Sequence, residues 1–179
     1  MPDHNTFKKD KTSGRIIIRK ANVGDVKNIM ELVNPFAASN LMLPRGPQYL
    51  YENIRDFAIA IDPDGAEANQ SQDHNGRGRF MGCGSLHVLW RDIAEVRALA
   101  IDADYHHMGV GKAIIEFIKQ ESRELKIKHL YTFTMSPEFF TELGFKEIGG
   151  DDLPQKLWGE CSRCPKYFNC DEIGMLYEL

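Results

Sequence analysis

A pair of glycines beside a lysine marks the segment of this sequence best suited to chemistry. Gly109 and Gly111 follow an apolar run, Ile93–Ile101, and open an amphipathic stretch. The first amides of a helix lack intrahelical partners and carry the positive end of its dipole, so such a junction suits a phosphate or pyrophosphate. Glycine lets the backbone approach that anion, and Lys112 adds a positive charge. The spacing therefore predicts an anion-binding loop.

Three anion-binding patterns compete for this loop. The Walker pattern fails because the glycine spacing differs and Ala113 follows the lysine. The dinucleotide pattern G-x-G-x-x-G fails because Ile114 occupies the third glycine position. The pattern [Gln/Arg]-x-x-G-x-[Gly/Ala] fits HHMGVG except at its first residue, His106. A glycine pair that only turns the chain is the remaining interpretation.

The elements around the loop predict a mixed α+β sheet with helices on both faces. Runs rich in β-branched and aromatic residues predict strands at Arg15–Ala21, Phe57–Ile61, Phe80–Trp90, Ile93–Ile101, His129–Met135, Phe145–Gly149 and Glu172–Leu179. Helical spacing predicts helices at 24–33, at 48–57, from Gly109 onward and at 136–143. We expect Pro35 to close the first, Ser136 to cap the start of the last, and Gly144 to end it.

Length and composition indicate an ordinary globular protein. The chain has 179 residues, of which 42% are apolar, and 22 basic against 26 acidic side chains give a net charge of −4. A mild negative charge argues against nucleic acid as a partner, and no apolar run reaches the roughly 18 residues that span a membrane. We expect a flexible tail at 1–14, one domain at 15–179 and a cytoplasmic location.

Four segments, IRKANVGDV, AEVRALAID, YHHMGVGKA and EFFTELGF, resemble the GNAT acetyltransferase superfamily over about Arg15–Trp158. The resemblance implies a mostly antiparallel, twisted sheet of about 6–7 strands, with splayed fourth and fifth strands and about four helices. It also implies that the loop cradles the pyrophosphate of acetyl-coenzyme A, and that free backbone groups of the preceding strand pair with the pantetheine arm. The implied phosphate residues are His106, His107, Met108, Gly109, Val110, Gly111 and Lys112, and the implied strand residues are Leu99, Ala100 and Ile101.

Acyl transfer to an amine needs a group that removes the amine's proton. Alternation along the strand predicts one face for Glu95, Arg97, Leu99 and Ile101, unless a bulge intervenes. The resemblance implies that Glu95 is this general base. Phe140 stands where the family often carries a tyrosine that protonates the leaving thiolate, so Tyr131, Tyr105 or water remain as proton donors.

The stretch NLMLPRGPQYLYENIRDF resembles N-acetylglutamate synthases, as does DDLPQKLW. The resemblance implies that Arg45 binds a substrate carboxylate, which a guanidinium pairs through two hydrogen bonds. Arg97 is a second candidate, whereas Met135 replaces an arginine that glutamate-binding members often carry. We therefore expect a short, stand-alone enzyme that acetylates L-glutamate for arginine biosynthesis. The alternatives are an acetyltransferase for another amine or a protein N-terminus, and a non-catalytic acyl-coenzyme A-binding or zinc-tethered interaction module.

The cysteines at 159–179 leave two interpretations open. Cys161, Cys164 and Cys170 have the spacing of a metal knuckle, which would need a fourth ligand such as Cys83. Reduced thiols in a reducing compartment are equally consistent with the pattern. We therefore assign no metal site and expect no metal in the chemistry. A homodimer is compatible with the expected fold.

Overall fold

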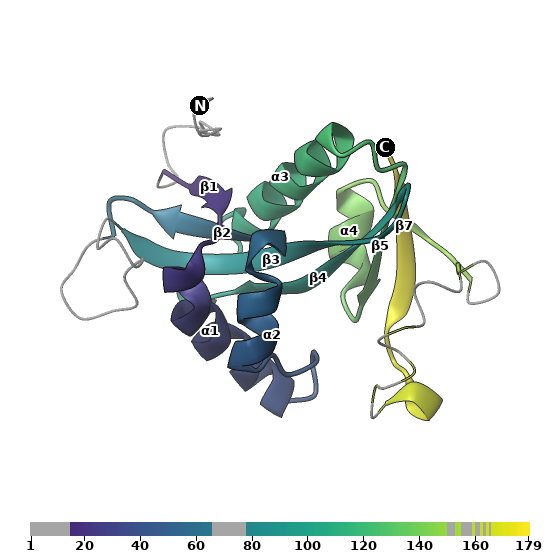
Figure 1. Cartoon of the computed structure of the whole chain (residues 1–179), viewed down its shortest axis with the longest axis horizontal. Helices are drawn as coiled ribbons and strands as arrows, with labels where there is room; N and C mark the ends of the chain where they lie inside the picture. Colours follow the sequence, from purple (N-terminus) through teal and green to yellow (C-terminus); the bar gives the residue numbers. More distant parts are fainter. Residues whose placement is uncertain are drawn as a thin grey trace. The chain divides into compact units, whose positions relative to one another are not determined.

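A computed structural model describes residues 15–65, 78–149 and 166–179, with residues 153, 154, 159, 162 and 164 between them (Figure 1). Its strands are β1 (Ile17–Lys20), β2 (Phe57–Asp62), β3 (Arg79–Trp90), β4 (Ile93–Ile101), β5 (His129–Thr134), β6 (Lys146–Glu147) and β7 (Ile173–Glu178). Its helices are α1 (Val26–Ala38), α2 (Pro47–Glu52), α3 (Val110–Glu124) and α4 (Pro137–Glu142). Short 3-10 helices are η1 (Val23–Asp25), η2 (Ile54–Asp56), η3 (Ala103–Tyr105) and η6 (Tyr167–Asn169). The expected tail at 1–14 lies outside the described residues.

The strands form one seven-stranded sheet in the order β1-β2-β3-β4-β5-β7-β6. β4 pairs with β5 in parallel, whereas β2 is antiparallel to both β1 and β3, and β7 is antiparallel to both β5 and β6. The predicted mixed α+β architecture is thus confirmed. No helix among the described residues is long and apolar enough to span a bilayer.

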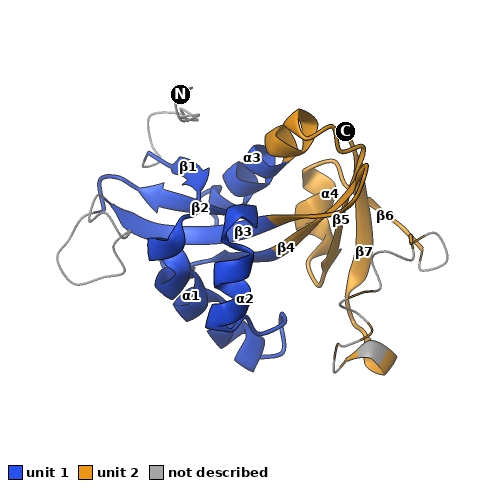
Figure 2. Cartoon of the chain, viewed as in Figure 1, with its two compact units in different colours: residues 1–85, 98–118 blue, residues 86–97, 119–179 orange. Residues whose placement is uncertain are grey.

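The chain divides into two compact units, residues 1–85 with 98–118 and residues 86–97 with 119–179 (Figure 2). We call them unit 1 and unit 2. In unit 1, α1 and α2 pack on one face of the sheet through a buried apolar cluster, and α3 begins on the other face. Gly84 lets α3 approach closely, because an added Cβ would lie 2.9 Å from Cγ2 of Ile114.

In unit 2, a buried lysine ties α3 to the end of α4. Nζ of Lys119 donates a hydrogen bond of 2.6 Å to the carbonyl of Leu143 and lies 4.2 Å from the ring centroid of Tyr177. Gly144 follows with φ of 86°, the left-handed conformation in which glycine commonly ends a helix. The predicted end of α4 is therefore confirmed, whereas the Ser136 side chain makes no capping hydrogen bond.

Two predicted helix boundaries are wrong. Pro35 does not close α1, which continues to Ala38 with the proline inside it. Proline removes one helical hydrogen bond, but Phe36 beyond it packs against the buried cluster and keeps the last turn in place. The second helix ends at Glu52, and a 3-10 turn leads into β2. The predicted inward residues Leu50, Ile54 and Phe57 are nonetheless all buried.

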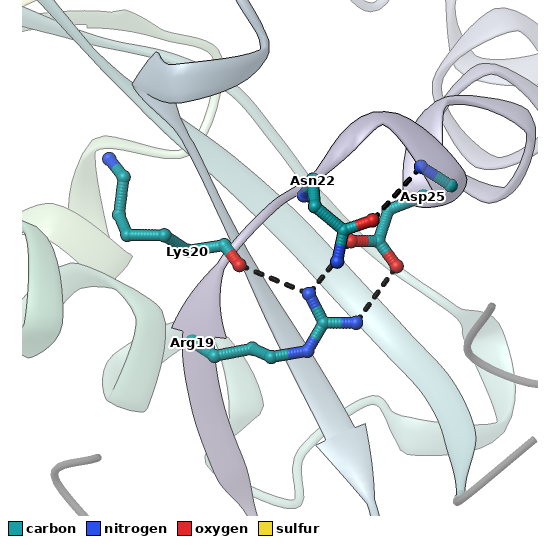
Figure 3. Close-up of polar contacts among 5 residues, drawn as sticks. Arg19, Lys20, Asn22 and Asp25 are labelled. Atoms are coloured by element: carbon teal, nitrogen blue, oxygen red, sulfur yellow. Dashed lines mark hydrogen bonds and ion pairs between the residues drawn. The ribbon is translucent and has the colours of Figure 1, made fainter. Parts of the chain in front are cut away.

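A buried ion pair joins β1 to the start of α1 (Figure 3). Arg19 donates to both carboxylate oxygens of Asp25, at 2.7 Å and 2.9 Å, and Asp25 is fully buried. Asn22 completes a capping box, because its backbone amide donates to Asp25 and its side chain accepts from the amide of Gly24. This junction sets the direction in which α1 leaves the sheet.

Candidate functional site

The parallel pairing of β4 with β5 ends before β4 does. The paired residues run from Ile93 with His129 to Val96 with Thr132, whereas β4 continues to Ile101. The expected splaying of these two strands is confirmed. Backbone groups of Leu99–Ile101 on this side are the ones predicted to pair with a pantetheine arm.

A left-handed residue interrupts β4 in the middle of the predicted site. Ala98 has φ of 50°, which for a residue other than glycine costs about 1–2 kcal/mol. Ala98 and Ala100 pack on the side of the α1 and α2 cluster, whereas Leu99 lies beside Ile114 near Gly84. This left-handed residue stands between Arg97 and Leu99, and the common face predicted for those two side chains stays a prediction. No glycine or proline in β4 predicts this positive φ from the sequence.

The loop after β4 is held to its neighbours by several hydrogen bonds. The amide of Asp102 donates to the carbonyl of Met81 at 2.9 Å, and Nε2 of His106 lies 3.1 Å from the carbonyl of Ile101. His107 and Gly109 have φ of 62° and 82°. The hydrogen bonds and the two left-handed residues together turn the chain sharply between β4 and α3.

The first turn of α3 presents its amides as predicted for an anion site. The first intrahelical bond is donated by Ala113 to the carbonyl of Gly109, at 3.0 Å. The amides of Val110, Gly111 and Lys112 precede it and therefore have no acceptor within the helix. They point along the positive end of the dipole of a helix that extends to Glu124. His106, His107, Met108 and Lys112 are exposed beside them.

An ion pair supports this loop from β3. Nη2 of Arg79 donates to Oδ2 of Asp104 at 2.5 Å, and the Arg79 guanidinium lies 5.0 Å from the ring centroid of Tyr105. The hydrogen bond to Asp104 raises the pKa of Arg79, and burial raises the pKa of Tyr105. Both groups keep their protons at neutral pH. The sequence did not single out Arg79, because its partner stands 25 residues away.

In unit 2, the structure brings together Glu95 and Arg97. Nε and Nη2 of Arg97 lie 2.8 Å and 2.6 Å from Oε2 of Glu95, and both side chains are buried. The guanidinium lies against one oxygen of the carboxylate and compensates its charge in this buried site. Arg97 is thus engaged with the candidate base, in addition to its predicted role as a substrate contact.

Two further residues of unit 2 bear on proton transfer. Tyr131 is the register partner of Glu95 on β5, and burial raises its pKa, so it stays protonated and able to donate. Glu172 precedes β7 and is exposed, and partial desolvation together with the charges of Asp171 and Glu95 raises its pKa. No sequence motif singles out Glu172, which only precedes a predicted strand. Phe140 is buried between the rings of Phe139 and Phe145, and its side chain has no acidic proton to donate to a thiolate.

Arg45, the predicted carboxylate contact, belongs to unit 1. It lies in the connection between α1 and α2 and is 8% exposed. Its guanidinium carbon lies 4.3 Å from the ring centroid of Tyr49. A loop arginine is usually solvated, so this burial sets Arg45 apart from an ordinary surface side chain.

The cysteine motif lies only partly within the described residues. Cys161 falls outside them, whereas Cys164 is half-buried and Cys170 is exposed. In the part of the chain that the structure describes, no group of three or more histidine, cysteine or acidic side chains is placed to hold a metal ion. Burial raises the pKa of Cys83 to about 12, and its thiol donates to the carbonyl of Ala98 at 3.6 Å. Cys83 is therefore a neutral core residue.

Comparison with known proteins places this geometry in a family. The sequence model described as the acetyltransferase (GNAT) family matches residues 33–145. An amino-acid acetyltransferase of Mycobacterium tuberculosis is 33% identical over 149 residues, which cover 83% of this chain and 79% of that protein. A crystal structure of Rv2747 from Mycobacterium tuberculosis, in complex with CoA and NLQ, matches with a TM-score of 0.72 at 28% identity, over 91% of this chain and 99% of the other. N-acetylglutamate synthase from Neisseria gonorrhoeae, complexed with coenzyme A and N-acetyl-glutamate, shares the fold at 23% identity with a TM-score of 0.76, over 92% of this chain and 35% of the other.

Proposed function

This chain belongs to the GNAT acetyltransferase family, and from that premise we propose that it transfers the acetyl group of acetyl-coenzyme A to the α-amino group of L-glutamate. The product would be N-acetylglutamate, which places the enzyme in arginine biosynthesis and in the cytoplasm. The observation that carries the proposal is the continuous course of the chain from the part of β4 beyond its pairing with β5, through the glycine loop, into α3. The similarity to an amino-acid acetyltransferase supports an amino acid as the acceptor.

The acyl donor is acetyl-coenzyme A. Its pyrophosphate would lie on the amides of Gly109–Lys112, where the α3 dipole favours negative charge. His106, His107 and Met108 would line the same loop. Carbonyl and amide groups of Leu99, Ala100 and Ile101 would pair with the pantetheine arm, as a further strand pairs with a sheet edge. This arrangement would hold the pantetheine arm along the end of β4.

The chemistry we propose is direct transfer without an acyl-enzyme. Glu95 accepts a proton from the substrate ammonium, directly or through a water, and the neutral nitrogen attacks the thioester carbonyl carbon. The nitrogen of the tetrahedral intermediate loses its second proton to water, the intermediate collapses with cleavage of the C–S bond, and the coenzyme thiolate takes a proton from Tyr131 or from water. Arg45 would bind a carboxylate of the acceptor through paired N–H groups.

Mass spectrometry of products from a panel of amino acids, together with release of free thiol, tests this function. We expect glutamate to give the highest kcat/KM. Glu95→Gln should lower kcat about 10²–10⁴-fold with the affinity for coenzyme A retained. A panel with no preference for glutamate would overturn the substrate, and full activity of Glu95→Gln would overturn the base.

An acetyltransferase for another small amine or a protein N-terminus is the second candidate. Two observations favour it. Arg97 already pairs with Glu95, and Met135 stands exposed at the end of β5, where glutamate-binding relatives often carry arginine. An unchanged KM in Arg45→Ala for the best acceptor would favour this second candidate.

A further inference from the structure

The loop between α1 and α2 holds its arginine more firmly than its sequence suggests. Arginine has several rotatable bonds, and ordering it when a substrate arrives would weaken binding. Two residues outside the loop restrain Arg45 in advance, one through its backbone and one through its guanidinium.

Asn34, in the third turn of α1, fixes the backbone of Arg45. Its Oδ1 accepts from the Arg45 amide at 3.1 Å, and its Nδ2 donates to the Arg45 carbonyl at 3.4 Å. One side-chain amide therefore pairs with both main-chain groups of a residue 11 positions later. Such pairing resembles the exchange of hydrogen bonds between two strands, and it fixes the position of the Arg45 Cα from which the side chain extends.

Tyr49, on α2, fixes the other end of the side chain. The Arg45 guanidinium carbon lies 4.3 Å from the Tyr49 ring centroid, well inside the range of a cation–π contact. The tyrosine is itself held in place, because Asn53 donates to the Tyr49 carbonyl at 2.8 Å. The ring therefore restrains the position of the guanidinium, whose N–H groups bind a carboxylate in a fork.

We propose that Asn34 and Tyr49 are positioning residues that pre-order Arg45 for the carboxylate of the acceptor. The proposal rests on the function proposed above, in which Arg45 binds that carboxylate. Asn34 fixes the backbone from which the side chain starts, and Tyr49 restrains the position of the guanidinium. The acceptor then meets a donor fork that is already oriented, so that less freedom is lost on binding.

Steady-state kinetics of Asn34→Leu and Tyr49→Leu test the proposal, with the amino acid that the wild-type enzyme acetylates fastest. Each variant should raise KM for that amino acid about two- to thirty-fold, because Tyr49→Leu removes a cation–π contact and Asn34→Leu removes two hydrogen bonds. The kcat and the KM for acetyl-coenzyme A should stay within about twofold, since a binding contact common to ground state and transition state changes KM alone. Tyr49→Phe, which keeps the ring, should restore the wild-type KM. Tyr51→Leu is the matched control on the same helix, because Tyr51 is 55% exposed.

Arg45→Ala, measured alongside, separates the two proposals. If Arg45→Ala raises the acceptor KM but both leucine variants match the wild type, the positioning role is wrong and the substrate contact stands. If Arg45→Ala itself leaves KM unchanged, the carboxylate role of Arg45 and the positioning role both fall. Should Asn34→Leu not fold, Asn34→Asp decides, since it keeps the acceptor but loses the donor to the Arg45 carbonyl. A wild-type KM in Asn34→Asp would overturn the role of Asn34.

Discussion

Gly82 offers a direct way to displace the strand that we propose to bind the coenzyme. A Cβ added at Gly82 would lie 2.8 Å from the carbonyl oxygen of Ala100 and 3.3 Å from Cα of Ile101. Ordinary contact begins near 3.4 Å, so Gly82→Ala must push the backbone of β4 by about 0.6 Å. The residues that move are the proposed partners of the pantetheine arm.

The expected size of the effect follows from overpacking. Inserting a methyl group into a packed core costs about 1–3 kcal/mol. Alanine also lowers the conformational entropy of the unfolded chain, which offsets about 0.4–1 kcal/mol of that cost. Gly82→Ala should therefore destabilise the protein by about 1–2 kcal/mol and lower Tm by about 2–8 °C. Because a misplacement of 1 Å can cost about a hundredfold in rate, we expect KM for acetyl-coenzyme A to rise about tenfold.

Gly84→Ala is the matched control for this experiment. Its added Cβ would meet only side chains, those of Ile114, Leu99 and Ile118. It should lower Tm but leave KM for acetyl-coenzyme A near the wild-type value, since no backbone atom of β4 is pushed. Thermal denaturation and initial-rate kinetics measure both quantities. Wild-type Tm and KM in Gly82→Ala, or equal rises of KM in both variants, would refute the reasoning.

Three further variants test other parts of the structure. Asp25→Asn should destabilise the protein by about 3 kcal/mol, because it leaves Arg19 beside a neutral partner in a buried site. Urea denaturation measures this change. A loss below about 1 kcal/mol, the value of a surface ion pair, would contradict the prediction. Arg79→Ala should raise KM for acetyl-coenzyme A about two- to fivefold by loosening the loop around Asp104, and adding Asp104→Ala should raise it no further; additive effects would show that the two residues act separately. Partial desolvation and the charges of Asp171 and Glu95 raise the pKa of Glu172 above its ordinary 4.5, so the stability this carboxyl contributes is complete below pH 4.5 and is lost as pH rises through the raised pKa. Glu172→Gln should therefore be more stable than the wild type at pH 7, by less than about 1 kcal/mol, and equal to it at pH 4; the opposite order at pH 7 in urea denaturation would exclude the effect.

Local signals predicted most of the elements because their causes are local. Alternation predicts β4 and helical spacing predicts α3, because a repeat of two or of 3.6 residues can be recognised from residues close together in the sequence. Gly144 was predicted as a helix end because only a residue tolerant of positive φ suits that position. The prediction that Pro35 closes the first helix is wrong because the cause is not local. Its effect on α1 depended on whether Phe36 found a buried contact, and no local pattern contains that contact.

The amino-acid sequence alone determined the glycine loop, the helix behind it and the residue types available for proton transfer and carboxylate binding. Those properties depend on backbone preference and side-chain chemistry at or near each position. The tertiary structure decided the left-handed conformation of Ala98, the burial of Arg45, and its restraint by Asn34 and Tyr49. Such features depend on which distant segments pack together, because burial and hydrogen bonding between them form only when the chain has folded.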